Sequence, residues 1–401
     1  MNIRKLWLFC TAALIVGAAG SAQAEQTIKL GVLNDKSSLY ADLTGTGSVT
    51  AAQMAVEDFG KTVLNRRIEV ITADHQNKPD IGSAITTRWI ETEKVSVIID
   101  VPTSSVAFAV QEVTRNLKVP LLISGAASSD LTGKACSPMT VHWTYDSYAL
   151  AAGAARGIVQ AGGTTWFFLA QDNLFGQALQ RDVTRFVEEA GGKVLGGVRH
   201  PLNSTDFASY LVQAEASKAK IIGLANAGSD FTNAIKQAGE FGLIAKGIRI
   251  AGLSVTINDV HSLGLKTAQG VQFVTPFYWD MTPETRAWSK RFFDKEKKMP
   301  NHIQAGVYGA VMHYLNAVKA ANTDDGPKVV DQMKKTPIND FFTKNGSIRV
   351  DGRVMREFHL MEVKAPGDSK YAWDYFKLVK TMTANDTAIP LKDSECALVK
   401  K

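Results

Sequence analysis

The sequence predicts an α/β protein of two doubly wound, Rossmann-like lobes joined by a hinge of several strands. Short apolar runs rich in β-branched residues alternate with segments in which apolar residues recur at helical spacing. This alternation breaks off at 133–138 and then begins again, so the chain contains two such units. Its 401 residues are enough for two lobes with separate cores, and we expect a cleft between them.

The first unit should form a parallel sheet, because a helical segment separates each expected strand from the next. The expected strands are 28–33, 67–73, 95–101 and 119–123. Helical periodicity indicates helices at about 52–59, 80–93 and 106–117.

The second unit repeats this order after the break. Its expected strands are 166–169, 193–198, 221–225 and 248–253. Its expected helices lie at about 146–160, 175–187 and 207–214.

The last part of the chain departs from this rhythm. A strand is expected at 271–277, helices at about 283–297, 304–321 and 327–334, a hairpin around Asp351 and Gly352, and a final strand within 371–382. We interpret the chain as returning to the first lobe near 272 and to the second near 340. The predicted domains are a first lobe of 25–144 plus 272–340, a second lobe of 145–271 plus 341–382, and a tail of 383–401.

Residues 1–24 have the pattern of a secretory signal peptide. Arg4 and Lys5 precede an apolar segment, and Ala22-Gln23-Ala24 matches a cleavage site. No later segment reaches the roughly 20 apolar residues of a spanning helix, so we expect a protein of the periplasm.

Removal of residues 1–24 would leave two cysteines, Cys136 and Cys396. An unpaired thiol is a liability in an oxidising compartment, so we predict that they form a disulfide that pins the tail. Two separately buried thiols are the alternative.

Charge and motifs argue against several function classes. The formal net charge is +6, but lysines are interleaved with acidic residues as on solvated helix faces, so we expect no nucleic-acid partner. The seven histidines show no spacing suited to a metal, and neither a G-x-S-x-G turn nor a phosphate-binding loop occurs. We therefore expect no cofactor and no catalysis, although a secreted enzyme on this fold stays an alternative.

Hydroxyl-bearing residues follow two neighbouring strands of the first unit. Thr103 and Ser104 follow the third expected strand, and Ser128 lies in the turn after the fourth. Ligands of open α/β sheets bind beyond the carboxyl ends of the strands, and helix starts attract anions through free N–H groups. We expect these turns to hold a carboxylate. The alternative is that the hydroxyls only cap their helices.

The second unit offers apolar and aromatic residues at the corresponding places. Phe175 lies at a helix start, with core packing as its alternative role, and Tyr145 and Phe277 lie near the expected crossovers. Asn226 and Ser254 follow two strands and could bind hydroxyl groups of a ligand. Aromatic walls with a few polar groups suit a small ligand with an apolar body.

Several segments resemble one known family. The signal peptide, VPTSSVAFAV, PLLISGAASSDLT, FFLAQDNLFGQAL and VYGAVMHYLNAVKAA resemble periplasmic solute-binding proteins of ABC transporters, in the branched-chain amino acid type. The resemblance covers nearly the whole chain after residue 24. It implies the type I periplasmic binding protein fold, hinge closure on a ligand, and a membrane permease as partner of a monomer. It also implies that a carboxylate is held by Tyr40, Thr103, Ser104, Ala126, Ala127 and Ser128.

Two departures from the family pattern bear on the ligand. Amino-acid binders keep an acidic residue where this chain has Ser254, and an aromatic residue where it has Ala227 and Gly228. An ammonium without a partner in a closed cleft is costly, so a zwitterion is disfavoured. The sequence is most similar to the subgroup that binds benzoate-type or phenylpropanoid acids, with Tyr40, Tyr145, Phe175 and Phe277 expected to stack on the ring. A branched-chain amino acid or amide, and a sensor module that docks on a membrane kinase, stay alternatives.

Overall fold

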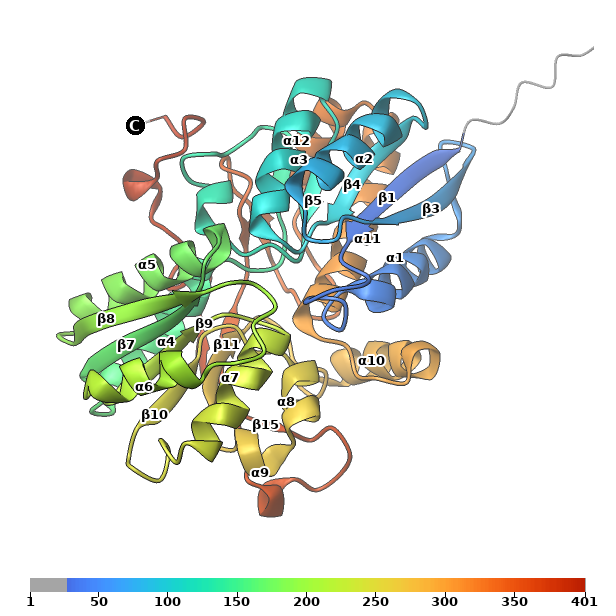
Figure 1. Cartoon of the computed structure of the whole chain (residues 1–401). Helices are drawn as coiled ribbons and strands as arrows, with labels where there is room; N and C mark the ends of the chain where they lie inside the picture. Colours follow the sequence, from blue (N-terminus) through green and yellow to red (C-terminus); the bar gives the residue numbers. More distant parts are fainter. Residues whose placement is uncertain (1–26, 401) are drawn as a thin grey trace, which may run out of the picture.

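The computed structural model describes residues 27–400, so the predicted signal peptide lies outside the described residues. Two α/β lobes lie side by side (Figure 1), as the sequence predicts. Within residues 27–400, no helix has both the length and the apolar character to cross a membrane.

The first lobe is built on a six-stranded sheet in the order β2-β3-β1-β4-β5-β6. All neighbouring pairs are parallel except β2 and β3. The strands are β1 (Ile28–Asn34), β2 (Thr62–Val63), β3 (Arg66–Asp74), β4 (Val95–Asp100), β5 (Leu121–Ile123) and β6 (Thr140–His142).

Helices cover both faces of this sheet because its strands are apolar on both sides. Val97 and Ile99 of β4 lie in the core under α1 and α11, whereas Ile98 lies in the core under α2 and α3. The helices are α1 (Gly45–Phe59), α2 (Pro79–Glu91), α3 (Ser104–Leu117), α10 (Pro283–Glu296), α11 (His302–Ala321) and α12 (Gly326–Lys335), and Ser129–Leu131 form the short turn η1.

The second lobe contains a parallel sheet in the order β10-β9-β7-β8. Trp166 and Phe168 of β7 belong to the core that includes α4 and α5, and Phe167 and Leu169 to the core that includes α6 and α7. The elements are α4 (Ser147–Gln160), β7 (Thr165–Gln171), α5 (Leu174–Glu189), β8 (Lys193–His200), α6 (Ala208–Ala216), β9 (Ile221–Ala225), α7 (Ser229–Glu240), β10 (Arg249–Gly252), α8 (Ile257–Leu263) and α9 (Leu265–Ala268).

Three antiparallel strands, in the order β11-β14-β15, pack against α4 of the second lobe. They are β11 (Gln272–Thr275), β14 (Phe358–Val363) and β15 (Phe376–Met382), and β14 and β15 flank the turn η2 (Pro366–Asp368). The expected hairpin is present as β12 (Ser347–Ile348) and β13 (Val354–Met355). Its turn contains Gly352 with a φ of 87°, a left-handed conformation that favours glycine.

The positions of β11 and β13 show where the chain passes between the lobes, for which crossovers near 272 and 340 are predicted. β11 pairs with β14 of the second lobe, and α10 and α11, which follow it, pack on α1 of the first. The hairpin packs on α12, and Arg353 forms a bridge to His142 in β6. The chain thus enters the first lobe after Thr275 and leaves it between β13 and β14. The apolar run at 271–277 predicts a strand but carries no signal for its pairing partner.

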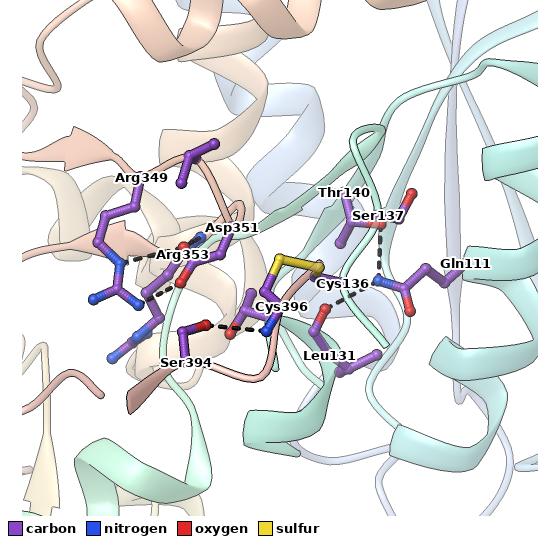
Figure 2. The surroundings of a disulfide bond; sticks show 12 residues. Gln111, Leu131, Cys136, Ser137, Thr140, Arg349, Asp351, Arg353, Ser394 and Cys396 are labelled. Atoms are coloured by element: carbon purple, nitrogen blue, oxygen red, sulfur yellow. Dashed lines mark hydrogen bonds and ion pairs between the residues drawn. A yellow bond between two sulfur atoms is a disulfide. The ribbon is translucent and has the colours of Figure 1, made fainter. Parts of the chain in front are cut away.

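Cys136 and Cys396 form a disulfide with a Cα–Cα distance of 5.5 Å, which confirms the predicted pairing. Figure 2 shows the bond beside the hairpin residues Arg349 and Arg353. The tail begins after β15 of the second lobe. Within the tail, the carbonyl oxygen of Ile389 accepts a hydrogen bond from Nη1 of Arg349 over 2.7 Å. The tail continues through the turn η3 (Leu391–Asp393) to the loop before β6. The disulfide therefore ties a segment that leaves the second lobe to the first lobe.

Candidate functional site

A cavity lies where the carboxyl ends of the two parallel sheets face each other. It leaves about 20 Å³ for the centre of a water-sized sphere and about 380 Å³ of space between atoms. A cavity of this size holds about one water molecule, so a ring-sized ligand requires the lining side chains or the two lobes to move apart. The lining residues are Tyr40, Leu43, Pro102, Gly125, Ala127, Tyr145, Phe175, Ala227, Ser254, Thr256 and Ile303. Within the described chain, no acidic or basic side chain lines it.

The first-lobe wall consists of two turns that follow β4 and β5. Asp100 at the end of β4 has a φ of 83°, and the turn continues to Pro102. A Cβ on Gly125 would lie 2.6 Å from Cα of Pro102, so only glycine allows the two turns to pack this closely. The N–H groups of Ala126 and Ala127 donate to no other described residue. These turns therefore hold free donors beside the cavity.

The start of α3 lies directly behind these turns. Thr103 does not cap the helix, because its hydroxyl donates to the side-chain oxygen of Asn77 instead. The N–H of Ser128 donates to Oγ of Ser104 over 3.2 Å, whereas the buried Oγ of Ser128 has no partner among the described residues. The N-terminal end of the α3 dipole thus adds a positive potential to this wall.

Two buried carboxyl groups lie close to the cavity. Burial raises the pKa of Asp100 to about 7, only partly offset by Ser48 and Asn34, and neither carboxylate oxygen has hydrogen-bond geometry to a partner. Burial also raises the pKa of Asp259 to about 7, although Thr256 donates to this carboxylate over 2.8 Å. Burial therefore favours the neutral form of both groups, which lowers the cost of placing an anion nearby.

Tyr40 and Tyr145 have ring orientations that are fixed by hydrogen bonds. Tyr40 Oη donates to Oε1 of Gln171 over 2.9 Å, and Gln171 Nε2 donates to Asp230 over 2.8 Å, so this chain of bonds crosses from the first lobe to the second. Tyr145 Oη donates to the carbonyl oxygen of Gly125 over 2.8 Å. Its ring packs edge-to-face on His302 with centroids 4.6 Å apart.

The second-lobe wall is made of side chains at the ends of β9 and β10 and the start of α5. Phe175 is placed in the first turn of α5 by Asn173, whose side chain accepts from the N–H of Gly176. Ala227 leaves space where a larger side chain would fill the cavity. Oγ of Ser254 has no hydrogen bond within residues 27–400 and faces the cavity.

The structure brings five of the predicted ligand contacts to the cavity: Tyr40, Ala127, Tyr145, Phe175 and Ser254. Thr103, Ser104, Ala126 and Ser128 lie in or next to the turns of the first-lobe wall but are not among the residues that line the cavity. Their contacts to a ligand, like those of the five, stay predictions.

Two predicted contacts lie elsewhere. Asn226 is fully buried and its Nδ2 lies 3.2 Å from Nε2 of His200. Phe277 packs edge-to-face on Trp288 in the first-lobe core, with centroids 6.2 Å apart. Neither lines the cavity.

Six lining residues had not been predicted as contacts: Leu43, Pro102, Gly125, Ala227, Thr256 and Ile303. Three of them, Pro102, Gly125 and Ala227, lie two residues after the end of a strand, so their position in the sequence could have indicated them. Leu43 and Ile303 have the pattern of ordinary core residues at helix starts.

Comparison with known proteins agrees with this architecture. The model of the periplasmic binding protein family matches residues 27–370. The chain belongs to this family. A crystal structure of a periplasmic binding protein from Burkholderia mallei is 45% identical and superposes with a TM-score of 0.92, covering 93% of this chain and 99% of that one.

Two further solved structures are similar to this periplasmic binding protein. A branched-chain amino acid ABC transporter periplasmic ligand-binding protein from Burkholderia xenovorans LB400 is 36% identical, with a TM-score of 0.84 over 93% of this chain and 100% of that one. A solute-binding protein of an ABC transporter from R. palustris, in complex with 4-hydroxybenzoate, is 23% identical, with a TM-score of 0.81 over 89% and 97% of the two chains. The fold is the type I periplasmic binding protein fold, and the protein is a substrate-binding component of an ABC transporter.

Proposed function

We propose that this protein binds an aromatic carboxylic acid, of the benzoate or phenylpropanoid type, in the cavity between its lobes and delivers it to a permease in the inner membrane. In this proposal residues 1–24 direct the chain to the periplasm, where it acts as a monomer without catalysis. Ligand contacts to both lobes favour the closed arrangement, and the difference in affinity between closed and open states drives hinge closure.

The observation that carries the proposal is a cavity that, among the described residues, has N–H groups without partners in one wall and no acidic side chain in its lining. The N–H groups of Ala126 and Ala127 and the start of α3 suit a carboxylate. An ammonium group would find no carboxylate in the lining, and its desolvation would go uncompensated. This arrangement favours an acid over a zwitterionic amino acid.

The shape and chemistry of the remaining walls support a ring as the ligand body. Tyr40, Tyr145 and Phe175 present aromatic surface from both lobes. The free hydroxyl of Ser254 could accept from or donate to a ring hydroxyl. The likeness to a structure that holds 4-hydroxybenzoate shows that this fold accommodates such acids.

Calorimetric titration tests the proposal with 4-hydroxybenzoate and leucine as paired ligands. We expect stoichiometric binding of the acid and at least about a tenfold weaker signal for leucine, a difference of 1.4 kcal/mol. Tight binding of leucine with no response to the acid would contradict the proposal and favour the branched-chain amino acid alternative. Conversion of an aromatic ester or amide to a product would favour the enzyme alternative.

A further inference from the structure

A second hollow opens on the outer side of the ligand cavity. It leaves about 580 Å³ for the centre of a water-sized sphere, against about 20 Å³ in the ligand cavity. Its lining comes from both lobes and is mostly polar, with residues 36–39, 41–43, 45 and 46 on one side and Asn203, Ser229, Thr232 and Asn258 on the other. We call this hollow the vestibule.

One residue lines both spaces, and it is Leu43. The side chain of Leu43 is 5% exposed, so it fills the position between the ligand cavity and the vestibule. Leu39 lines only the vestibule, and Tyr40 lines only the cavity. Leu43 is therefore the side chain that separates the two spaces.

The backbone of Leu43 is held from two directions. Its N–H donates to the carbonyl oxygen of Tyr40 over 3.0 Å. Its carbonyl oxygen accepts from Asn301 Nδ2 over 2.9 Å, and the same amide donates to Oδ1 of Asn258 in α8 of the second lobe. The backbone of Leu43 is thus held by contacts on both sides of the cleft.

The closed lobes meet close to this position. A Cβ on Gly228 would lie 2.6 Å from the carbonyl oxygen of Leu39, and Gly228 has a φ of 62°. Because the lobes are in close contact at this point, the space into which a longer ligand can extend here is the vestibule beyond Leu43.

We infer that Leu43 sets the maximum length of the ligand, so that the protein accepts single-ring acids and excludes acids with a second ring. This inference rests on the proposed function and deepens it. Shortening Leu43 should join the cavity to the vestibule, where the polar lining and larger volume can take the added group. A bulkier residue at 43 should shorten the cavity further.

The test compares benzoate with biphenyl-4-carboxylate, which have the same head group and differ by one ring. Calorimetry on the unaltered protein should show benzoate binding at least about tenfold more tightly. In Leu43→Ala this ratio should fall by about tenfold or more, through a gain for the longer acid. In Leu39→Ala, a leucine truncation that borders the vestibule but not the cavity, the ratio should stay unchanged.

A second variant keeps the test decisive if Leu43→Ala does not fold. Leu43→Phe should weaken binding of 4-substituted benzoates more than that of benzoate, with folding of each variant checked by thermal unfolding. An unchanged ratio in folded Leu43→Ala, or an equal loss for both ligands in Leu43→Phe, would overturn the role of Leu43. Failure of the unaltered protein to bind either acid would instead overturn the proposed function.

Discussion

The two walls of the ligand cavity are built by different means. The first-lobe wall consists of backbone turns, with Gly125 packed on Pro102 and free N–H groups at Ala126 and Ala127. The second-lobe wall consists of side chains, namely Phe175, Ala227 and Ser254. Backbone donors recognise a charge type whatever the ligand body is, whereas side chains shape the space for that body. The first wall should therefore set the class of head group, and the second should set which molecules of that class fit.

The largest expected effect is a loss of stability when the disulfide is removed, with both walls of the cavity left intact. In the double variant Cys136→Ser and Cys396→Ser, the loss of a crosslink between residues 260 positions apart should lower the free energy of unfolding by about 4 kcal/mol. Affinity for 4-hydroxybenzoate should change little, because neither cysteine lines the cavity. Denaturant unfolding and calorimetry measure the two quantities, and a large loss of affinity in the folded variant would contradict this division of roles.

The next largest effect is expected when a negative charge is added to the second-lobe wall. Ser254→Asp places a carboxylate on the second-lobe wall, opposite the expected head group, and should weaken benzoate binding by about 100-fold through repulsion in a closed cavity. Leucine should gain affinity, because the new carboxylate can pair with its ammonium.

Ser254→Asn is the matched control for this substitution, since it has nearly the same shape and no charge. It should weaken benzoate binding much less than Ser254→Asp. Equal effects of the two variants would mean that space rather than charge decides binding at this wall.

The packing of the first-lobe wall can be broken at Gly125. In Gly125→Ala the added Cβ meets the backbone of Pro102 and should lower the free energy of unfolding by about 2 kcal/mol while displacing the N–H donors. Gly239→Ala is the control, because no atom lies within 4 Å of its added Cβ. That variant should be as stable as the parent protein or slightly more stable. Thermal unfolding of the two variants tests the difference.

The smallest effect concerns the carboxyl group of Asp100 behind this wall. Burial raises its pKa from 3.8 to about 7, so the folded chain holds a proton between about pH 4 and pH 7 that the unfolded chain releases. Stability contributed by this group therefore falls as the pH rises through that window.

Asp100→Asn removes this dependence. We expect the stability advantage of the variant over the parent protein to grow from pH 5 to pH 8, by on the order of 1 kcal/mol or more. Thermal unfolding at both pH values measures the gain. A difference that shrinks as the pH rises would contradict the raised pKa.

Most of the fold could be predicted from local pattern. The continuous apolar run Trp166–Leu169, whose residues belong alternately to the two cores of the second lobe, is visible in the sequence. Pairing between distant segments is not visible, so the partner of β11 could not be predicted. The position of Phe277 also differs from the prediction. Thr275 Oγ donates to its carbonyl oxygen over 2.9 Å in a local turn, and its ring lies in the first-lobe core rather than in the cavity.

The site was predictable where it is made of turns and less so where it is made of apolar side chains. Small residues after β5 predicted a wall of the candidate site, and Gly125 and Ala127 of this run line the cavity. Leu43 and Ile303 carry no such signal, since an apolar residue at a helix start usually belongs to the core. Asn226 was misleading for a related reason, as its buried amide lies against His200, a partner from a distant strand.

The most direct test of the central claim compares benzoate with benzamide by calorimetry. The two ligands have the same ring and nearly the same shape, and only benzoate has a negative charge. If free N–H donors and the α3 dipole select a carboxylate, benzoate should bind about 100-fold more tightly, a difference of about 2.7 kcal/mol. Equal affinity for the two ligands would show that the first-lobe wall does not recognise charge and would contradict the account.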